Sequence, residues 1–415
     1  MNIEQENAVN CVVEGNNTFV TGSAGVGKSF FINKLKSVLD FLKKEYVVLA
    51  PTGIAAVNVK GQTIHRFFSL RIETKTLDDY LQSCLKFSKI DWDNLTILIV
   101  DEVSMWNISL FNLCDSVCRF HKKSNLPFGG IQLVLVGDFY QLCPIREKSE
   151  CIDDPLYIFE TSLWDTLKFN VHVLKKVMRQ NDTEFITILN NIRTGNVNRE
   201  TRLYLKKLGE KSVDTRHHYI ELYSKNVDKN KANETRVQRL PSLKKVFNSF
   251  DNGDSKYFNC SRVEKQVELK IGAPVMLLWN LTNDNLYNGS LGIIEEFTIE
   301  GLPKVRFNSG ITRVIEKQKW EIKQKNSDGT TSLLASRKQI PLQLAYAMSG
   351  HKSQGSTLDH IIVDTRDTFA SGQLYVMLSR ASTPDGIILR NFDLKHIKVD
   401  KRVTDFYKTR VPLQE

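Results

Sequence analysis

The sequence predicts an α/β protein with two α/β units, the first of which is built on a doubly wound parallel sheet. Three observations support this: short apolar runs recur, segments of helical periodicity lie between them, and a glycine-rich loop follows the first run. The runs of the first unit are residues 18–21, 46–50, 96–100 and 132–136, and such runs are typical of buried parallel strands. Because strands and helices alternate, ligands are expected beyond the carboxyl ends of the strands.

A second set of strand candidates follows, again with helical stretches between them: residues 171–174, 219–223, 273–279, 360–364 and 386–389. Residues 286–340 differ, because turn signals such as Asn308-Ser309-Gly310 separate short alternating segments, which indicates a small β barrel inserted in the second unit. Another insertion, about residues 70–89, shows no clear strand periodicity. The predicted domains are therefore residues 1–170, residues 171–285 with 341–415, and the inserted residues 286–340.

Composition limits the class of protein. At 415 residues, with 41% hydrophobic and 25% charged residues, the chain is expected to be soluble and globular, with no apolar stretch long enough to span a bilayer. The first ten residues are polar and acidic rather than signal-like, so an intracellular protein is expected. Lys and Arg outnumber Asp and Glu by 57 to 47, which gives a net charge of +10 and favours a polyanionic partner, although basic surfaces also serve solubility.

The seven cysteines are an odd number without a C-x-x-C pair, so a structural metal site is not expected. Cys114 and Cys118 are one helical turn apart and are predicted to pack as small buried hydrophobic residues.

A phosphate-binding loop of the pattern G-x-x-x-x-G-K-[ST] lies between the first apolar run and a helical stretch. Its residues are Gly22, Ser23, Ala24, Gly25, Val26, Gly27, Lys28 and Ser29. The backbone N–H groups can close around phosphates, Lys28 can reach the β and γ oxygens, and the Ser29 hydroxyl can hold Mg²⁺. The loop alone predicts that ATP or GTP is bound.

Two acids, Asp101 and Glu102, end the third apolar run. Beside a phosphate loop, Asp101 would hold Mg²⁺ through water and Glu102 would orient the water that attacks the γ phosphate, whereas an isolated acidic pair is often a helix cap. Gln141 follows the next run and could sense the γ phosphate or its water, although Gly-Asp at this point is also a common turn. Gln5 could pair with adenine, or be an ordinary surface glutamine.

Arg179 and Arg380 of the second unit are candidates for contacts with the γ phosphate across a cleft between domains. The alternative for each is a surface salt bridge.

Groups that bind a phosphate backbone without reading bases are small hydroxyls, exposed glycine backbone and cations. The candidates are Thr52, Gly53, Thr63 and His65 in the first unit, and His351, Lys352, Ser353 and Thr357 in the second. Phe67, Phe68 and Tyr375 could stack on bases, although aromatic residues beside a strand more often belong to the core.

Taken together, these segments resemble the petite integration frequency (Pif) family of superfamily 1 DNA helicases over nearly the whole chain. Gln5 is similar to the adenine-recognising motif, residues 22–29 to motif I, 50–56 and 61–65 to motif Ia and its extension, 101–105 to motif II and 137–142 to motif III. Arg179 falls on motif IV, residues 350–357 on motif V and 373–381 on motif VI. Residues 115–119 and 127–132, between motifs II and III, resemble the segment that separates this family from its relatives.

The resemblance implies two RecA-like P-loop domains with parallel sheets, a short wedge insertion in the first and an SH3-like β barrel in the second. It also implies ATP with Mg²⁺ as cofactor and 5′-to-3′ movement on single-stranded DNA. Departures from the family pattern are Cys143, where proline is usual, Arg66, where serine is common, and Met178, where phenylalanine is common.

We therefore expect an ATP-dependent DNA helicase that acts as a monomer on single-stranded, forked or tailed duplex DNA. Four-stranded guanine structures are a further candidate substrate, and the expected roles are replication, repair, recombination or telomere maintenance. The setting would be a prokaryotic cytoplasm, or a nucleus or virus-associated compartment. The alternatives are an RNA-directed motor and a nucleotide-gated DNA-binding switch that does not unwind.

Overall fold

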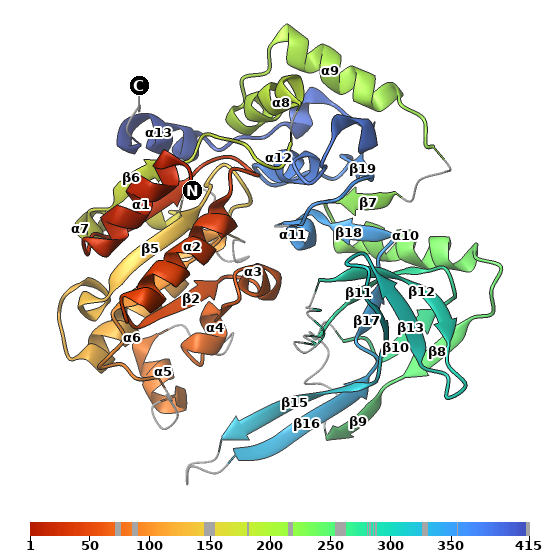
Figure 1. The fold of residues 1–415 in the computed structure, drawn as a ribbon, viewed down its shortest axis with the longest axis horizontal. Coiled ribbons are helices and arrows are strands. Elements are labelled where there is room, and N and C mark those ends of the chain that lie inside the picture. Colours follow the sequence, from red (N-terminus) through yellow and green to blue (C-terminus); the bar gives the residue numbers. More distant parts are fainter. Residues whose placement is uncertain are drawn as a thin grey trace. The chain divides into compact units, whose positions relative to one another are not determined.

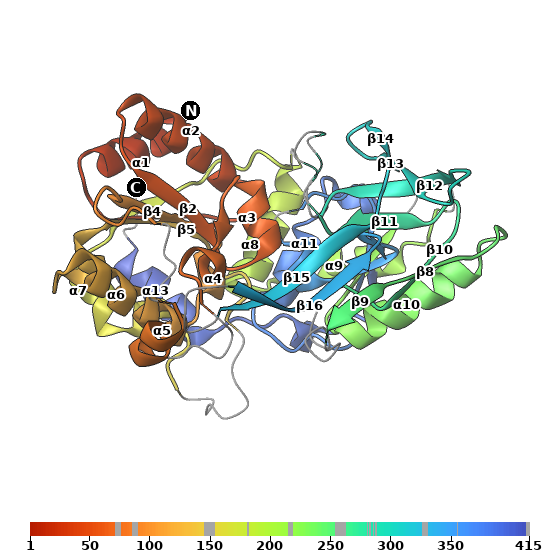
Figure 2. The same cartoon turned by 90° about the horizontal axis from the view of Figure 1, so that it is seen from below.

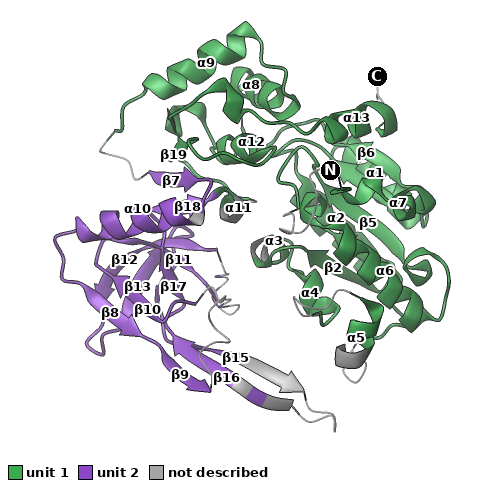
Figure 3. Ribbon diagram, turned by 180° about the vertical axis from the view of Figure 1, so that it is seen from behind, with its two compact units in different colours: residues 1–218, 350–415 green, residues 219–349 purple. Residues whose placement is uncertain are grey.

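The computed structural model describes the chain except residues 71–75, 85–89, 145–153, 181, 215–218, 254–262, 280, 282–283, 285, 287–288, 326–330, 355 and 412–415. The side chains of His351 and Lys352 and part of the 70–89 insertion therefore lie outside the described residues. The chain divides into two compact units, Met1–His218 with Gly350–Glu415 and Tyr219–Ser349 (Figure 3). These differ from the two predicted α/β units, and they are called the first and the second unit from here on.

The first unit contains a six-stranded parallel sheet in the order β3-β2-β4-β5-β1-β6. Its strands β2, β5 and β6 are labelled in Figure 1. Its strands are β1 (Thr18–Thr21), β2 (Tyr46–Ala50), β3 (Gln62–Thr63), β4 (Ile97–Val100), β5 (Gln132–Gly137) and β6 (Asn170–Val173). The predicted apolar runs all form strands here, which confirms the parallel α/β fold.

Two hydrophobic cores cover the two faces of this sheet, because successive strand residues point to opposite sides. Val134 and Val136 of β5 join the core of α1 (Ile3–Val13) and α2 (Lys28–Phe41), whereas Leu133 and Leu135 face the core of α6, α7 and α13. Figure 2 shows these two groups of helices on opposite sides of the sheet. Of the helices just named, α6 is Ile108–Lys122, α7 is Ser162–Leu167 and α13 is Lys401–Arg410. Three more helices lie near this sheet: α3 (Gly53–Asn58), α4 (Ile64–Phe67) and α5 (Leu77–Cys84).

The strand predicted at residues 171–174 forms, but its assignment to the second α/β unit is wrong. It is β6, which pairs in parallel with β1 in register Thr18 to Asn170 through Thr21 to Val173. The apolar pattern identified the strand but carried no information about its neighbour.

The rest of the first unit contains a parallel strand pair, β19 (Ile361–Asp364) and β20 (Ile387–Arg390), with α8 (Thr183–Thr194), α9 (Arg199–Glu210), α11 (Gly350–Ser353) and α12 (Gln373–Leu378). Short 3-10 helices are Val103–Met105, Pro127–Gly130, Ile158–Glu160, Pro384–Gly386 and Leu394–His396.

A clamp joins α6 to the 3-10 helix Pro127–Gly130. The Asp115 carboxylate accepts hydrogen bonds from the backbone N–H of Phe128 (2.6 Å) and from Arg119 Nε (2.7 Å). Gly129 has φ +64° and lies against α6, where an added Cβ would be 2.7 Å from the carbonyl oxygen of Cys118. Residues 115–119 and 127–132, which resemble the segment that separates the family from its relatives, therefore pack α6 against the 3-10 helix.

The second unit begins with β7 (Ile220–Tyr223), which pairs in parallel with β18 (Ala347–Ser349), and α10 (Asn226–Gln238). The sequence between α10 and β18 contains a five-stranded antiparallel sheet in the order β14-β13-β12-β11-β17. Its strands are β11 (Pro274–Leu277), β12 (Leu291–Phe297), β13 (Pro303–Phe307), β14 (Thr312–Val314) and β17 (Leu342–Leu344). β8 (Lys245–Asn248) pairs with β10 (Gln266–Leu269), and β15 (Gln318–Lys325) with β16 (Thr331–Gln339), which also pairs with β9 (Phe250–Gly253).

Strand β11 differs from the sequence prediction in the direction of its neighbours. The run at residues 273–279 was expected in a parallel sheet, but β11 pairs antiparallel with β12 and β17. All four residues of β11 are buried, so the run has no polar alternation and looks like a parallel strand. The antiparallel strands therefore begin before residue 286.

Two smaller expectations can be compared with the structure. Cys114 and Cys118 are fully buried, as predicted. Among the described residues no helix is long and apolar enough to cross a membrane.

Candidate nucleotide site and nucleic-acid candidates

The phosphate-binding loop lies between the end of β1 and the start of α2. Gly25 and Gly27 have φ of +82° and +86°, and a Cβ at Gly25 would be 2.7 Å from Arg179 Cβ, so glycine is required there. Lys28 Nζ donates hydrogen bonds to the carbonyl oxygens of Gly22 (2.8 Å) and Ser23 (2.9 Å). Burial lowers the pKa of Lys28, while Asp138, Glu102 and Asp101 oppose this shift, so the ammonium lies among three carboxylates.

The predicted carboxylates lie directly after β4. Asp101 is buried and accepts a hydrogen bond from the Glu102 backbone N–H (2.9 Å), and burial together with the charge of Glu102 raises the pKa of Asp101. Among the described residues no group of three or more His, Cys, Asp or Glu could hold a metal on its own. The Ser29 hydroxyl and the Asp101 carboxylate are oxygen donors of the kind Mg²⁺ prefers, and Mg²⁺ commonly completes its shell with phosphates and water. The residues therefore fit a nucleotide-bound Mg²⁺.

Arg179 and Arg380 come together at one point of the first unit. Arg179 Nη1 donates to the carbonyl oxygen of Ser379 (3.1 Å), and Arg380 Nη2 donates to the Ser379 hydroxyl (2.8 Å). Arg380 is only 2% exposed, which excludes a surface salt bridge, and burial together with the charge of Arg179 lowers the pKa of Arg380 to about 9. Glu102 opposes that shift, so the two guanidinium groups and this carboxylate share one environment.

Gln5 lies beside the phosphate-binding loop. Its side-chain Nε2 is 3.5 Å from the carbonyl oxygen of Gly27, and its Oε1 accepts from the Asn2 backbone N–H in the capping box of α1. At 5% exposure it is not the surface glutamine of the alternative interpretation.

Gln141 is directed toward a buried ion pair. Its Nε2 donates to Asp138 Oδ2 (3.4 Å), and Asp138 accepts two hydrogen bonds from Arg193 of α8, each 2.8 Å long. The Arg193 guanidinium lies 4.6 Å from the ring centroid of Tyr140 and 5.5 Å from that of Tyr407. Burial alone would lower the pKa of Arg193. The charge and hydrogen bonds of Asp138 outweigh burial, so the pKa of Arg193 is raised. Sequence reasoning missed Arg193, because nothing in the local sequence relates it to Asp138.

A second residue that sequence reasoning did not single out is Gln354. Its side-chain Nε2 donates a 2.8 Å hydrogen bond to Glu102 Oε2. The available signal was its place within residues 350–357, where only its neighbours were proposed to bind the polymer.

The candidates for phosphate-backbone contacts occupy different environments. Thr52 Oγ1 accepts from the Ala55 N–H (3.2 Å) and Thr63 Oγ1 from the Arg66 N–H (3.3 Å), so both hydroxyls cap short helices. His65 is half-buried, and burial lowers its pKa. Gly53, at the start of α3, is partly exposed, and Thr357 is exposed.

Ser353 differs from the other hydroxyl candidates because it is fully buried. Its hydroxyl donates to the carbonyl oxygen of Gly350 (2.8 Å), so the side chain completes its own turn and is not presented to a ligand.

The aromatic candidates also belong to the interior. Phe67 packs against Phe68 and Trp92, with ring centroids 4.9 and 6.0 Å away, and all three rings are buried. Tyr375 is 2% exposed, and its hydroxyl accepts from the Ala24 backbone N–H (2.7 Å). We therefore assign these rings to core packing instead of base stacking, and Tyr375 to support of the phosphate-binding loop.

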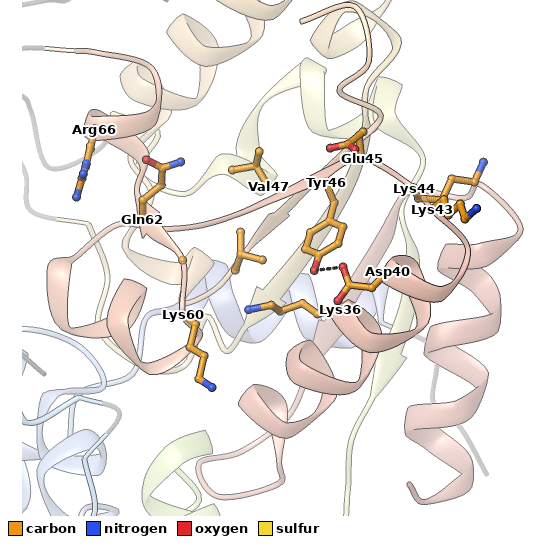
Figure 4. A pocket seen from close by; sticks show the side chains of 12 residues that line it. Lys36, Asp40, Lys43, Lys44, Glu45, Tyr46, Val47, Lys60, Gln62 and Arg66 are labelled. Atoms are coloured by element: carbon orange, nitrogen blue, oxygen red, sulfur yellow. Dashed lines mark hydrogen bonds between the residues drawn. The ribbon is translucent and has the colours of Figure 1, made fainter. Parts of the chain in front are cut away.

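A basic hollow lies beside β2 in the first unit (Figure 4). Five cations line it together with two acids: Lys36, Lys43, Lys44, Lys60 and Arg66, with Asp40 and Glu45. The cations are in excess because they outnumber the two acids, of which Asp40 accepts a hydrogen bond from the Tyr46 hydroxyl (2.8 Å). Residues 60–62 and 66 border the segment that contains Thr63 and His65, so this charge lies next to predicted phosphate contacts.

Two family models match the sequence. The model described as PIF1-like helicase matches residues 1–203, and that described as DNA helicase Pif1, 2B domain, matches residues 259–297. The ATP-dependent DNA helicase PIF1 of Homo sapiens is 35% identical over 98% of this chain and 63% of its own length. The ATP-dependent DNA helicase RRM3 of Saccharomyces cerevisiae is 31% identical over 98% of this chain and 67% of its own.

Solved structures extend this similarity to the fold. The crystal structure of Pif1 helicase from Candida albicans is 32% identical and matches with a TM-score of 0.89, covering 98% of this chain and 99% of that chain. Pif1 helicase from Bacteroides in complex with ADP-AlF3 and ssDNA is 31% identical, with a TM-score of 0.82 and coverage of 99% and 98%. The similarity confirms the two RecA-like domains and the family resemblance, and this chain belongs to the PIF1-like helicase family.

Proposed function

We propose that this chain is an ATP-dependent DNA helicase that moves 5′-to-3′ along single-stranded DNA and unwinds duplex DNA. The observation that carries the proposal is the convergence of half-buried Lys28 and Glu102 with buried Arg380 in one electrostatic environment, although they lie far apart in the sequence. Because ATP hydrolysis builds charge on the γ phosphate, a lysine, a water-orienting carboxylate and a buried arginine are the groups that it requires.

In this proposal each residue has one task in hydrolysis. Lys28 neutralises the β and γ phosphates, and Ser29 and Asp101 hold Mg²⁺, which supplies charge stabilisation when bound. Glu102 orients the attacking water. Arg179 and Arg380 stabilise the charge that develops on the γ phosphate, a contribution of about 10³ to 10⁵ in rate for such arginines.

Nucleotide recognition would use the same part of the first unit. Gln5 lies at the loop and would pair with the adenine edge, while the glycines allow the backbone to approach the phosphates. The complex of the Bacteroides relative with ADP-AlF3 and ssDNA supports the binding of an adenine nucleotide.

Single-stranded DNA would be held through its phosphates by Thr52, Gly53, Thr63, His65 and Thr357. His351 and Lys352 complete the proposed set, and Ser353 would contribute its backbone alone. The basic hollow beside Thr63 would add long-range attraction for the strand. We further propose that the SH3-like domain expected at residues 286–340 is the antiparallel part of the second unit, which begins before residue 286.

The number of molecules at work and the cellular setting are also proposed. We infer that one molecule suffices for movement on DNA, although a related structure describes unwinding at forked dsDNA by two coordinating Pif1 helicases. Replication, repair or recombination in a prokaryotic cytoplasm, a nucleus or a virus-associated compartment would supply such substrates.

The proposal is tested by the ATP turnover of purified protein with equal nucleotide concentrations of single-stranded DNA or RNA. We expect strong stimulation by DNA and weak stimulation by RNA. Equal stimulation would favour an RNA-directed motor, and DNA binding without unwinding of a 5′-tailed duplex would favour a nucleotide-gated switch.

A further inference from the structure

The hydrogen bond between Gln354 and Glu102 joins two segments that are 252 residues apart. Gln354 is only 6% exposed, and its Nε2 lies 2.8 Å from Glu102 Oε2. One carboxylate oxygen of the proposed water-orienting residue is therefore held by an amide donor, which leaves the other oxygen for a different partner.

The opposite end of the same amide is its oxygen, Oε1. Gln354 Oε1 is buried and accepts no hydrogen bond within the part of the chain that the structure describes. A buried amide oxygen without a donor costs about 1–3 kcal/mol, so it is rarely retained without a role. A donor that arrives with the substrates would remove this cost.

A water molecule aligned for attack on a γ phosphorus is such a donor. To direct its lone pair at phosphorus, the water must donate its two hydrogens elsewhere, so it needs two acceptors. Glu102 Oε1 supplies one and Gln354 Oε1 can supply the other. Gln141, the amide expected to handle the water, is directed toward Asp138 instead.

The backbone around Gln354 is fixed by local contacts. Ser353 Oγ donates to the Gly350 carbonyl (2.8 Å), and the Ser356 N–H donates to the Ser353 carbonyl (3.1 Å). Two residues further, the Leu358 N–H donates to the carbonyl oxygen of Arg380 (2.9 Å). The turn that holds Gln354 is thus tied to the proposed arginine finger and lies three residues before Thr357, a proposed DNA contact.

We propose that Gln354 is a positioning residue that fixes Glu102 with its amide nitrogen and the attacking water with its amide oxygen, and that strand binding near Thr357 acts on hydrolysis through it. This rests on the proposed function. In the step itself the water oxygen bonds to the γ phosphorus, a water proton passes to Glu102, and the bond to the bridging oxygen breaks with its electron pair leaving on ADP.

The test compares wild-type protein with Gln354→Met, which keeps the length of the side chain but neither hydrogen bond. We expect kcat for DNA-stimulated ATP hydrolysis to fall about tenfold to hundredfold, with KM for ATP within about twofold. Affinity for ADP with aluminium fluoride, which resembles the transition state, should fall by a similar factor while affinity for ADP stays the same. Because both act on one water, Gln354→Met with Glu102→Gln should be no slower than Glu102→Gln alone.

Two further variants keep the result interpretable. Gln238→Met changes an exposed glutamine of α10 and should leave every value unchanged. If Gln354→Met does not fold, Gln354→Glu, which keeps an acceptor but loses the donor, should show the same loss of kcat. Unchanged kcat, or equal weakening of ADP and ADP with aluminium fluoride, would overturn the inference. A wild-type protein without DNA-stimulated turnover would instead contradict the proposed function.

Discussion

Glu102 has an unusual backbone for a residue with a side chain. Its φ is +51°, in the left-handed region, directly after strand β4. Such a conformation costs about 1–3 kcal/mol and persists only where surrounding structure enforces it. Here it accompanies a side chain that contacts Gln354 and shares an environment with Lys28 and Arg380, so the strain coincides with the proposed chemistry.

Glu102→Gln is expected to bind ATP with near-normal affinity and to hydrolyse it about 10² to 10⁴ times more slowly, because the amide cannot accept the water proton. Steady-state turnover together with equilibrium binding of a fluorescent ATP analogue measures both values. Normal turnover would show that another residue orients the water.

Arg380→Ala is expected to reduce DNA-stimulated hydrolysis about 10³-fold or more and to leave ATP binding largely intact, because the guanidinium acts on charge that forms only in the transition state. Arg410→Ala is the control, since Arg410 pairs with Asp165 at an exposed site. Turnover equal to that of the control variant would remove Arg380 from the mechanism.

At this scale the sequence predicted those site residues that belong to local motifs. Lys28 and Glu102 follow strands, and Arg380 lies in a compact motif, so each could be identified from its neighbours. Arg193 and Gln354 could not, because their importance comes from partners 55 and 252 residues away. The sequence also could not predict that Phe67 and Tyr375 are buried, since an aromatic side chain can either pack in a core or stack on a base.

Among the elements, the clamp between α6 and Pro127–Gly130 shows how a family signature can be structural. Asp115 accepts from a backbone N–H and from Arg119, and the α6 backbone approaches Gly129 too closely for any Cβ. We infer that this segment is retained to position β5, which it directly precedes, and through it Asp138.

Asp115→Ala is expected to lower the free energy of unfolding by about 1.5–3 kcal/mol, because hydrogen bonds to a charged acceptor are lost and the Phe128 N–H is left buried. Urea denaturation followed by circular dichroism measures the change.

Lys206→Ala is the matched control for Asp115→Ala, since the Lys206–Glu210 pair of α9 is well exposed and should contribute less than about 1 kcal/mol. Equal stability of the two variants would show that the clamp is not a stabilising contact.

The sequence predicted the positions of strands better than it predicted which strands pair with each other. The apolar runs located β1, β2, β4 and β5, since burial on both faces leaves a continuous hydrophobic signal. The same signal assigned β6 to the wrong unit, because it carries no information about which strand lies beside it. It also misplaced β11, because a fully buried strand looks alike in a parallel and an antiparallel sheet.

Across the whole molecule, the proposed nucleotide residues all belong to the first compact unit, and the antiparallel strands of the second lie in residues 219–349. The net charge of +10 and the basic hollow beside Thr63 give the chain a means of attracting a polyanion. We propose that ATP hydrolysis at the first unit drives directed movement along a DNA strand.

This proposed movement is tested by measuring the unwinding of two DNA duplexes that differ only in whether the single-stranded tail is 5′ or 3′. With ATP and Mg²⁺, we expect the wild-type protein to unwind the 5′-tailed duplex and not the 3′-tailed one, and Glu102→Gln to unwind neither. Unwinding of the 3′-tailed duplex alone, or of neither duplex by a wild-type protein that hydrolyses ATP, would contradict the account.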